Sequence, residues 1–394
     1  MAASLAAPCS VSAAEKTTLT FWHAMGGTNG EVLQQIVDDF NASQDEIEIK
    51  AEYQGTYDDT ITKLKAAMQS DSGLPDVCQM YDVGTKFMYD SGAVIPVEDK
   101  FESTGYDKSS VMEVISSYYT VDGKQYAMPF NVSTPMLYYN KDVFEAAGLD
   151  PETPPTTYDE VLEDAKKIVE SGAAPVGYSQ AIYGWFFEQQ LAGLGVTYGN
   201  NDNGRKEAVT AVDFDSNGGG LKVFDMWKKL YDSGYFEDYG TTTADTQTAF
   251  FSGQVGMIIE STAILKNAVD SSPFEVGTGY LPRIEQNDEG GVIIGGGSLW
   301  LTDTGNEANE DAAWKFIEYI TTPDVQAKWS MGTGYFAINE KAYETEDMKA
   351  YLKENPNFET AINQLKDSPV NCNTAGVLSG VQTEARLTFN EIMP

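Results

Sequence analysis

The sequence predicts an α/β protein of two lobes with a ligand cleft between them. The chain has 394 residues, more than a single hydrophobic core usually organises. Strand-like and helix-like segments alternate along it without a fixed repeat length, which argues against a solenoid or a propeller. Open α/β sheets bind ligands beyond the carboxyl ends of their strands, so we expect the site between the lobes.

The first hundred residues have a βαβαβ order. The two helices are predicted from apolar spacing, with Val32, Ile36 and Phe40 on one face of the first and Ile61 and Leu64 on one face of the second. This alternation is typical of a mainly parallel sheet covered by helices on both faces. The predicted segments are strands at 17–22, 47–53 and 76–81 and helices at 31–43 and 58–70.

A second unit begins near residue 128. Its clearest signal is a capping box, in which Thr157 and Glu160 precede an apolar helical pattern that Gly172 ends. The other predicted segments are an extended stretch at 136–140, a short helix from Asp142 to Gly148, helices at 221–231, 263–268 and 309–321, and strands at 255–259 and 292–301.

Composition excludes two classes of function. The chain carries 25 Lys and Arg against 60 Asp and Glu, and the resulting formal charge of −35 opposes binding to nucleic acid. No run of about 18 apolar residues occurs, so we expect no membrane-spanning helix. A small anion stays compatible with the charge, because the Debye length at physiological salt is only about 8 Å.

Residues 1–15 read as a signal remnant or a cloning scar, because small residues occur there without a basic start or a full apolar core. Cys9 follows a proline, which is a poor match to a lipoprotein cleavage site and leaves lipid anchoring open. Cys78 and Cys372 are too few for a disulfide framework and lack metal-ligand spacing. We therefore expect buried free thiols and no metal site.

The inventory of catalytic groups is thin. His23 is the only histidine, so Ser-His-Asp chemistry would have to use it. The glycines at 295–297 lead into another strand-like stretch rather than into the helix that a phosphate-cradling loop requires. Among 60 acids, the adjacent Asp58 and Asp59 fit a solvated face better than a catalytic pair. We expect neither an enzyme nor a cofactor.

Five motifs occur in order along the chain: Phe21-Trp22-His23-Ala24-Met25, Tyr81-Asp82-Val83-Gly84-Thr85, the stretch 129–135 followed by 137–142, the stretch 295–300, and Thr333-Gly334-Tyr335. Together they resemble the extracellular solute-binding proteins (family 1) of ABC importers, especially the sn-glycerol 3-phosphate binders. The likeness covers residues 17 to 390, and it implies the periplasmic-binding-protein fold of class II, with multiple hinge crossings between the lobes.

Carrying the family's ligand contacts onto the matching positions implies seven site residues. Trp185 and Trp300 are candidates for cleft walls only, whereas Trp22 and His23 fit a packed core strand better than a ligand contact. The seven implied contacts are Tyr57, Asp82, Ser133, Ser261, Gly296, Tyr335 and Arg386.

Each implied contact has a physical rationale. The guanidinium of Arg386 offers a fixed fork of donors that suits phosphate oxygens. Ser261 follows a strand and precedes a predicted helix, so its hydroxyl and the neighbouring N–H groups could face an anion. Asp82 and Ser133 would take the glycerol hydroxyls, which gives the ligand a polarity.

Gly296 would let backbone N–H approach the ligand, and Tyr57 and Tyr335 would donate phenolic hydrogen bonds. Structural alternatives stay open for every position: Arg386 as an ion pair, Ser261 as a helix cap, Gly296 as a bulge, and either tyrosine as a core residue.

Two positions depart from the family pattern. Asp82 stands where glutamate is usual and is one methylene shorter, so the glycerol end would sit deeper or be bridged by water. Ile182 replaces an expected aromatic residue, which weakens the case for choline or ethanolamine diesters, because their head groups favour aromatic contacts.

The resemblance implies an extracytoplasmic binding protein, a monomer, that closes around sn-glycerol 3-phosphate or a related glycerophosphodiester and delivers it to an ABC permease with its ATPase subunits. A neutral sugar or oligosaccharide binder of the same fold is the nearest alternative, followed by a surface adhesin or structural protein and, last, by a secreted hydrolase. The expected N-terminal lobe comprises 16–129 and 277–330, and the expected C-terminal lobe comprises 130–276 and 331–394.

Overall fold

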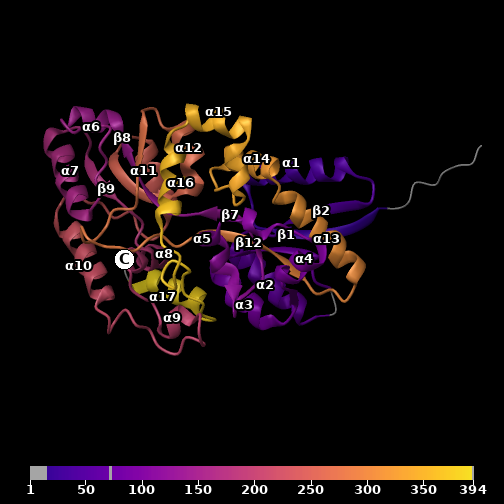
Figure 1. Cartoon of the computed structure of the whole chain (residues 1–394). Helices are drawn as coiled ribbons and strands as arrows, with labels where there is room; N and C mark the ends of the chain where they lie inside the picture. The colour runs from indigo at the N-terminus through magenta and orange to yellow at the C-terminus, as the bar shows by residue number, and fades with distance from the viewer. Residues whose placement is uncertain (1–15, 71–72, 393–394) are drawn as a thin grey trace, which may run out of the picture.

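The computed structural model describes residues 16–70 and 73–392, and Figure 1 shows two α/β lobes that meet along strands β7 and β12. The expectations for residues 1–15, including Cys9, lie outside this range. Within the described ranges, no helix combines the length and the apolar character needed to cross a bilayer.

The first lobe contains a six-stranded sheet in the order β2-β1-β3-β12-β4, with β7 paired to β12. Its N-terminal half is the predicted βαβαβ unit, in which β1 pairs in parallel with β2 and β3. The elements of this unit are β1 (Thr17–His23), α1 (Gly27–Ser43), β2 (Ile47–Tyr53), α2 (Tyr57–Met68) and β3 (Val77–Tyr81).

The other half of this sheet is antiparallel, so the prediction of a mainly parallel sheet is wrong here. β12 (Gly295–Thr302) runs antiparallel to β3, to β4 (Val94–Ile95) and to β7 (Met128–Ser133). The physical reason is that β12 enters from the second lobe rather than through a helical crossover, which parallel neighbours require.

The first lobe is completed by short elements and two later helices. They are 3₁₀ helix η1 (Asp82–Gly84), α3 (Thr85–Ser91), α4 (Val97–Thr104), 3₁₀ helix η2 (Lys108–Ser110), α5 (Glu113–Ser116), 3₁₀ helix η3 (Ser117–Tyr119), β5 (Thr120–Val121), β6 (Lys124–Gln125), α13 (Glu307–Ile320) and α14 (Pro323–Thr333).

The second lobe contains a four-stranded sheet in the order β11-β8-β10-β9. Its capping box is confirmed, because Thr157 accepts from the N–H of Glu160 and Gly172 ends the helix in the left-handed conformation. Its elements are β8 (Pro135–Asn140), α6 (Lys141–Ala146), α7 (Tyr158–Ser171), β9 (Val176–Ser179), α8 (Gly184–Gly193), α9 (Asn200–Gly204), α10 (Gly219–Asp232), α11 (Thr243–Phe251), β10 (Val255–Ser261), 3₁₀ helix η4 (Thr262–Ile264), α12 (Leu265–Ser271) and β11 (Val276–Gly279).

The C-terminal segment runs back along the second lobe. α17 (Gln382–Ile392) packs on α8 and also contacts η1 of the first lobe. Figure 1 shows this helix in yellow beside α9, on the other side of the molecule from α15. The remaining elements are 3₁₀ helix η5 (Glu340–Glu344), α15 (Glu346–Glu354) and α16 (Asn357–Asp367).

The strand pairings locate the changes from one sheet to the other. β7 belongs to the first sheet through Ser133, and β8 begins the second sheet at Pro135. β11 pairs with β8, and β12 then returns to the first sheet. The expected lobe boundary at 129/130 therefore falls within β7. The boundary at 276/277 falls at the start of β11, and the boundary at 330/331 falls within α14.

Two large core clusters and a third, small one stabilise the lobes. The largest extends from the first sheet to one face of the second sheet, and the second largest covers the other face, beneath α7, α8 and α10. Cys78 is buried as expected, and burial raises the pKa of its thiol to about 12. Cys372 is only partly buried, contrary to expectation, because it lies in the irregular segment before α17.

Candidate functional site between the lobes

The site residues gather where the chain passes from β7 to β8. Asn131, which the sequence analysis did not single out, is the hub of the first-lobe side: it is fully buried, accepts from Gln79 Nε2 at 2.6 Å and donates to Tyr57 Oη at 2.7 Å. Tyr57 stacks on Tyr81 with ring centroids 5.2 Å apart. Burial raises the pKa of Tyr335, while hydrogen bonds with Asn131 and Tyr57 oppose that shift. The two predicted tyrosines therefore meet at one amide.

Gly296 is required by packing against β7. Its φ is +92°, and an added Cβ would lie 1.8 Å from the carbonyl oxygen of Asn131. An L side chain would meet both a strained backbone and a collision. The close approach predicted for this glycine is real, but its partner here is a strand of the protein rather than a ligand.

Ser133 and Ser261 lie on either side of this crossing. Ser133 ends β7 opposite Gly295, and Ser261 ends β10 opposite Pro135. Ser133 as a residue is only 4% exposed, and its hydroxyl makes no hydrogen bond among the described residues. It can therefore serve a ligand without losing a protein contact.

The N–H groups expected to face an anion near Ser261 are already used. The N–H of Ser261 donates to Glu260 Oε1 at 2.6 Å, that of Thr262 to the carbonyl of Thr134 at 2.8 Å, and that of Ala263 to Ser261 Oγ at 3.1 Å. The predicted helix at 263–268 begins instead as η4, whose cap consumes these donors. The anion cradle expected here is therefore wrong, and only the hydroxyl proton of Ser261 stays available.

Arg386 lies in α17 and donates to carboxylates from both lobes. Its Nη2 is 2.8 Å from Asp82 Oδ2 in the first lobe, and its Nε and Nη2 are 2.7 and 2.6 Å from the two carboxylate oxygens of Glu188 in α8. Gln382, one turn earlier, donates to Glu188 Oε1 at 2.6 Å. We call these four residues the Arg386 cluster.

The electrostatics of the Arg386 cluster are unusual for a single guanidinium. The side chains of Asp82, Glu188 and Arg386 are 6%, 4% and 17% exposed. Burial by itself lowers the pKa of Arg386, but the charges of Asp82 and Glu188 outweigh it and raise that pKa well above its usual value. One guanidinium against two carboxylates leaves a formal charge of −1.

This geometry changes the expected polarity of the site. Asp82 and Arg386 were assigned to opposite ends of a ligand, yet they form one ion pair across the lobes. Nη1 of Arg386 and Oδ1 of Asp82 have no hydrogen bond within residues 16–70 and 73–392. These two atoms stay available to a ligand.

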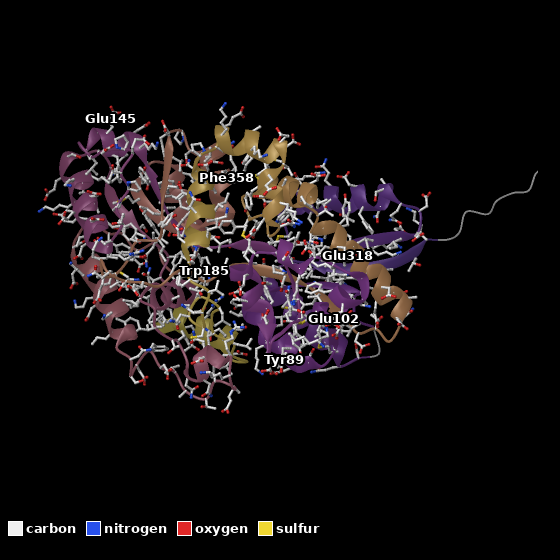
Figure 2. The ribbon with its side chains drawn as sticks, in the orientation of Figure 1. Tyr89, Glu102, Glu145, Trp185, Glu318 and Phe358 are labelled. Atoms are coloured by element: carbon white, nitrogen blue, oxygen red, sulfur yellow. The ribbon has the colours of Figure 1, made fainter. Side chains whose placement is uncertain are left out.

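The two tryptophans differ in position. Trp185 lies toward the middle of the molecule, whereas Glu145 lies on its outer edge (Figure 2). An added Cβ on Gly295 would be 2.7 Å from Trp185 Cζ2, so the indole of α8 packs directly on β12. Trp300 has no exposed surface and packs within the core of the first lobe.

Sequence reasoning missed Glu188 and Asn131. A signal for Glu188 is present, because it is the one charged residue in the apolar run Trp185-Phe186-Phe187-Glu188. A carboxylate on the buried face of a helix requires a cation or several donors. Asn131 gives no comparable signal, since its role depends on the closeness of β7, β12 and α2.

Comparisons with known proteins agree with this architecture. The profile of the bacterial extracellular solute-binding proteins matches residues 35–360. The chain is 33% identical over 385 residues to the sn-glycerol-3-phosphate-binding periplasmic protein UgpB of Agrobacterium fabrum, covering 95% of this chain and 86% of that protein. It is 31% identical over 382 residues to UgpB of Escherichia coli K12, with coverage of 95% and 86%.

Solved structures show the same fold. The cyclic alpha-maltosyl-1,6-maltose binding protein from Arthrobacter globiformis superposes with a TM-score of 0.78 at 25% identity, covering 95% of this chain and 92% of that chain. UgpB from Mycobacterium tuberculosis in complex with glycerophosphocholine gives a TM-score of 0.78 at 23% identity, with coverage of 90% and 87%. The chain belongs to the bacterial extracellular solute-binding proteins and works outside the cytoplasm.

Proposed function

We propose that the chain is the binding component of an ABC importer and captures sn-glycerol 3-phosphate or a related glycerophosphodiester between its lobes. It acts by binding and closure rather than by catalysis, as a monomer, and passes its ligand to a permease whose ATPase subunits supply the energy. The lobes close because the ligand contacts both of them, so binding favours the closed state.

The observation that carries this proposal is the position of Arg386. The guanidinium is held by one carboxylate from each lobe, and its Nη1 stays free to donate. Ser133 and Ser261 bring hydroxyls from the two sheets to the same crossing. A phosphate oxygen at Nη1 and glycerol hydroxyls at Asp82 Oδ1 and these serines would satisfy each group, since carboxylates accept from O–H and guanidinium donates to phosphate. The relatives from Agrobacterium fabrum and Escherichia coli are named as sn-glycerol-3-phosphate-binding proteins.

A neutral sugar or oligosaccharide is the second candidate. The Arg386 guanidinium is already compensated by two carboxylates, so the site does not require an anion. Carboxylates and tyrosines are also suitable partners for sugar hydroxyls and sugar faces. The similar structure from Arthrobacter globiformis is that of a cyclic alpha-maltosyl-1,6-maltose binding protein.

The test is isothermal titration of protein that has been unfolded and refolded to strip carried-over ligand. The ligands are sn-glycerol 3-phosphate, glycerophosphocholine and maltose. Arg386→Ala should lose about 1.5–3 kcal/mol of binding free energy for the phosphate ligands, the range for a hydrogen bond to a charged group. Arg283→Ala is the matched control, because it removes the same charge from an exposed side chain.

Binding of either phosphate ligand by the refolded wild type, weakened by Arg386→Ala and kept in Arg283→Ala, supports the proposal. Binding of maltose alone, unaffected by Arg386→Ala, would replace it with a sugar importer. Thermal unfolding of both variants shows whether a loss of binding reflects a loss of folding.

A further inference from the structure

Glu188 is placed to control which charge the site accepts. It lies in α8, whose residues from 184 to 192 are all buried, and its carboxylate accepts from Gln382 Nε2, Arg386 Nε and Arg386 Nη2 at 2.6, 2.7 and 2.6 Å. It is therefore a fixed, fully hydrogen-bonded anion rather than a mobile surface acid.

The hydrogen bonds of Glu188 occupy the edge of Arg386 that a phosphate would otherwise use. A guanidinium binds an oxyanion most strongly through two parallel N–H donors, and the Nε–Nη2 edge is such a pair. Glu188 takes both donors of this edge. A ligand is left with Nη1, which gives a weaker contact with less directional specificity.

The charge around the site is negative before a ligand enters. The Arg386 cluster alone holds two carboxylates, those of Asp82 and Glu188, against one guanidinium. Each added negative charge on a ligand therefore meets uncompensated repulsion in a buried setting, where screening by salt is weak.

We propose that Glu188 is a specificity-determining residue that selects ligands with at most one negative charge. This inference rests on the function proposed above and narrows it to a substrate class. A phosphate monoester has its second pKa near 6, so it is largely a dianion at pH 7.5, whereas a phosphodiester is a monoanion. The site thus favours glycerophosphodiesters over sn-glycerol 3-phosphate itself.

The sharpest test compares two ligands that differ by one methyl group and one charge. They are sn-glycerol 3-phosphate and its methyl diester, sn-glycero-3-phosphomethanol, each titrated calorimetrically into refolded protein at pH 7.5. The wild type should bind the diester more tightly. Glu188→Gln keeps the size of the side chain and an acceptor for Arg386, and it should shift the ratio of the two dissociation constants toward the monoester by about tenfold.

Two further variants control for charge and for folding. Glu145→Gln makes the same chemical change at the outer edge of the molecule and should leave the ratio unchanged (Figure 2). Glu188→Asp keeps the charge and should keep the preference for the diester, even if both ligands bind less tightly. This variant supplies a folded comparison if Glu188→Gln loses stability.

Failure of the inference differs from failure of the proposed function. A wild type that prefers the monoester, or a ratio that stays the same in Glu188→Gln, overturns the role of Glu188 while the phosphate-binding function stands. If no variant binds either phosphate ligand, the proposed function falls and takes the inference with it.

Discussion

Two partly buried arginines, Arg386 and Arg205, bridge the lobes by opposite means. Arg386 donates to the carboxylates of Asp82 and Glu188. Within the described ranges, Arg205, at the end of α9, donates only to backbone carbonyls. Its Nη1 donates to Tyr118 at 2.9 Å and to Thr120 at 3.5 Å, its Nη2 and Nε donate to Gly376 at 3.1 and 3.3 Å, and Nη2 also donates to Ala375. One bridge is made of charges and the other of peptide dipoles.

The pKa shifts of the two guanidinium groups follow this difference. Burial lowers the pKa of Arg205, and no carboxylate of residues 16–70 and 73–392 reverses this shift. The carboxylates of Asp82 and Glu188, in contrast, raise the pKa of Arg386. Backbone carbonyls do not titrate and cannot leave, so Arg205 is held in one arrangement. A carboxylate can exchange a protein partner for a ligand, so the contact between Asp82 and Arg386 can change with binding while Glu188 keeps its edge of the guanidinium.

The backbone immediately before Arg205 has a left-handed conformation that tertiary contacts must hold in place. Asn201, Asp202 and Asn203 all have positive φ, and Gly204 follows at +79°. An added Cβ on Gly204 would lie 2.4 Å from the carbonyl oxygen of Leu378. Four successive left-handed residues are costly unless tertiary contacts fix them. The segment therefore serves the placement of Arg205 against the first lobe.

The largest expected effect is a loss of unfolding free energy that depends on pH when Arg386 is replaced and does not when Arg205 is replaced. Arg386→Met leaves two buried carboxylates without their cation and should cost about 3–5 kcal/mol of unfolding free energy at pH 7.5. In this variant the carboxylates favour their protonated forms in the folded state, so the cost should fall as the pH is lowered toward the usual carboxyl pKa near 4. Urea denaturation from pH 7.5 to 4.5 measures it.

Arg205→Met should cost about 3 kcal/mol, because it leaves buried carbonyls without donors. Its partners do not titrate in this range, so the cost relative to wild type should be the same at pH 7.5 and at pH 4.5. A cost that falls with pH for Arg205→Met, or stays constant for Arg386→Met, would break the comparison.

His23 makes its own contribution to the pH dependence of the unfolding free energy, and this contribution must be subtracted in the same pH series. Burial lowers its pKa from 6.5 to about 4. The folded state thus binds fewer protons than the unfolded state between these values, so its contribution is present above pH 6.5 and is lost as the pH falls toward 4. Wild type should lose about 2 kcal/mol from this group between pH 7 and 5. His23→Gln should remove that part of the slope, and an unchanged slope would show that the imidazole is not buried.

The smallest expected effect concerns a neutral contact across the lobes. Tyr81 Oη and Thr383 Oγ1 are 3.0 Å apart and join β3 to α17. Thr383→Val removes this hydrogen bond while the Tyr81 contact with Asp58 stays intact. Ligand affinity should fall by about two- to tenfold, since the closed state loses about 0.5–1.5 kcal/mol. An unchanged affinity in calorimetry would mean that the hydrogen bond persists in the open state.

Most elements could be predicted from the sequence because their signals are local. The apolar spacing of α1 and α2 and the capping box of α7 each specify a helix within about fifteen residues. The direction of β12 could not be predicted, because it depends on which lobe the chain leaves before it enters the sheet.

The same limit applies to the site. The sequence analysis singled out Arg386 and Asp82 but assigned them to different ends of a ligand. Their contact joins residues 304 positions apart, and the two hydrogen bonds from Arg386 to Glu188 join residues 198 positions apart. No local sequence pattern predicts a pairing over such a distance. The expectation that the N–H groups around Ser261 face an anion failed for a different reason, because the cap of η4 uses these donors.

The most direct test is a crystal structure of the refolded protein with sn-glycero-3-phosphomethanol. We expect the phosphate within hydrogen-bond distance of Arg386 Nη1, the glycerol hydroxyls at Asp82 Oδ1 and Ser133, and Glu188 still bound to the Nε–Nη2 edge of Arg386. A ligand that lies away from Arg386, or that takes this edge after displacing Glu188, would contradict the account.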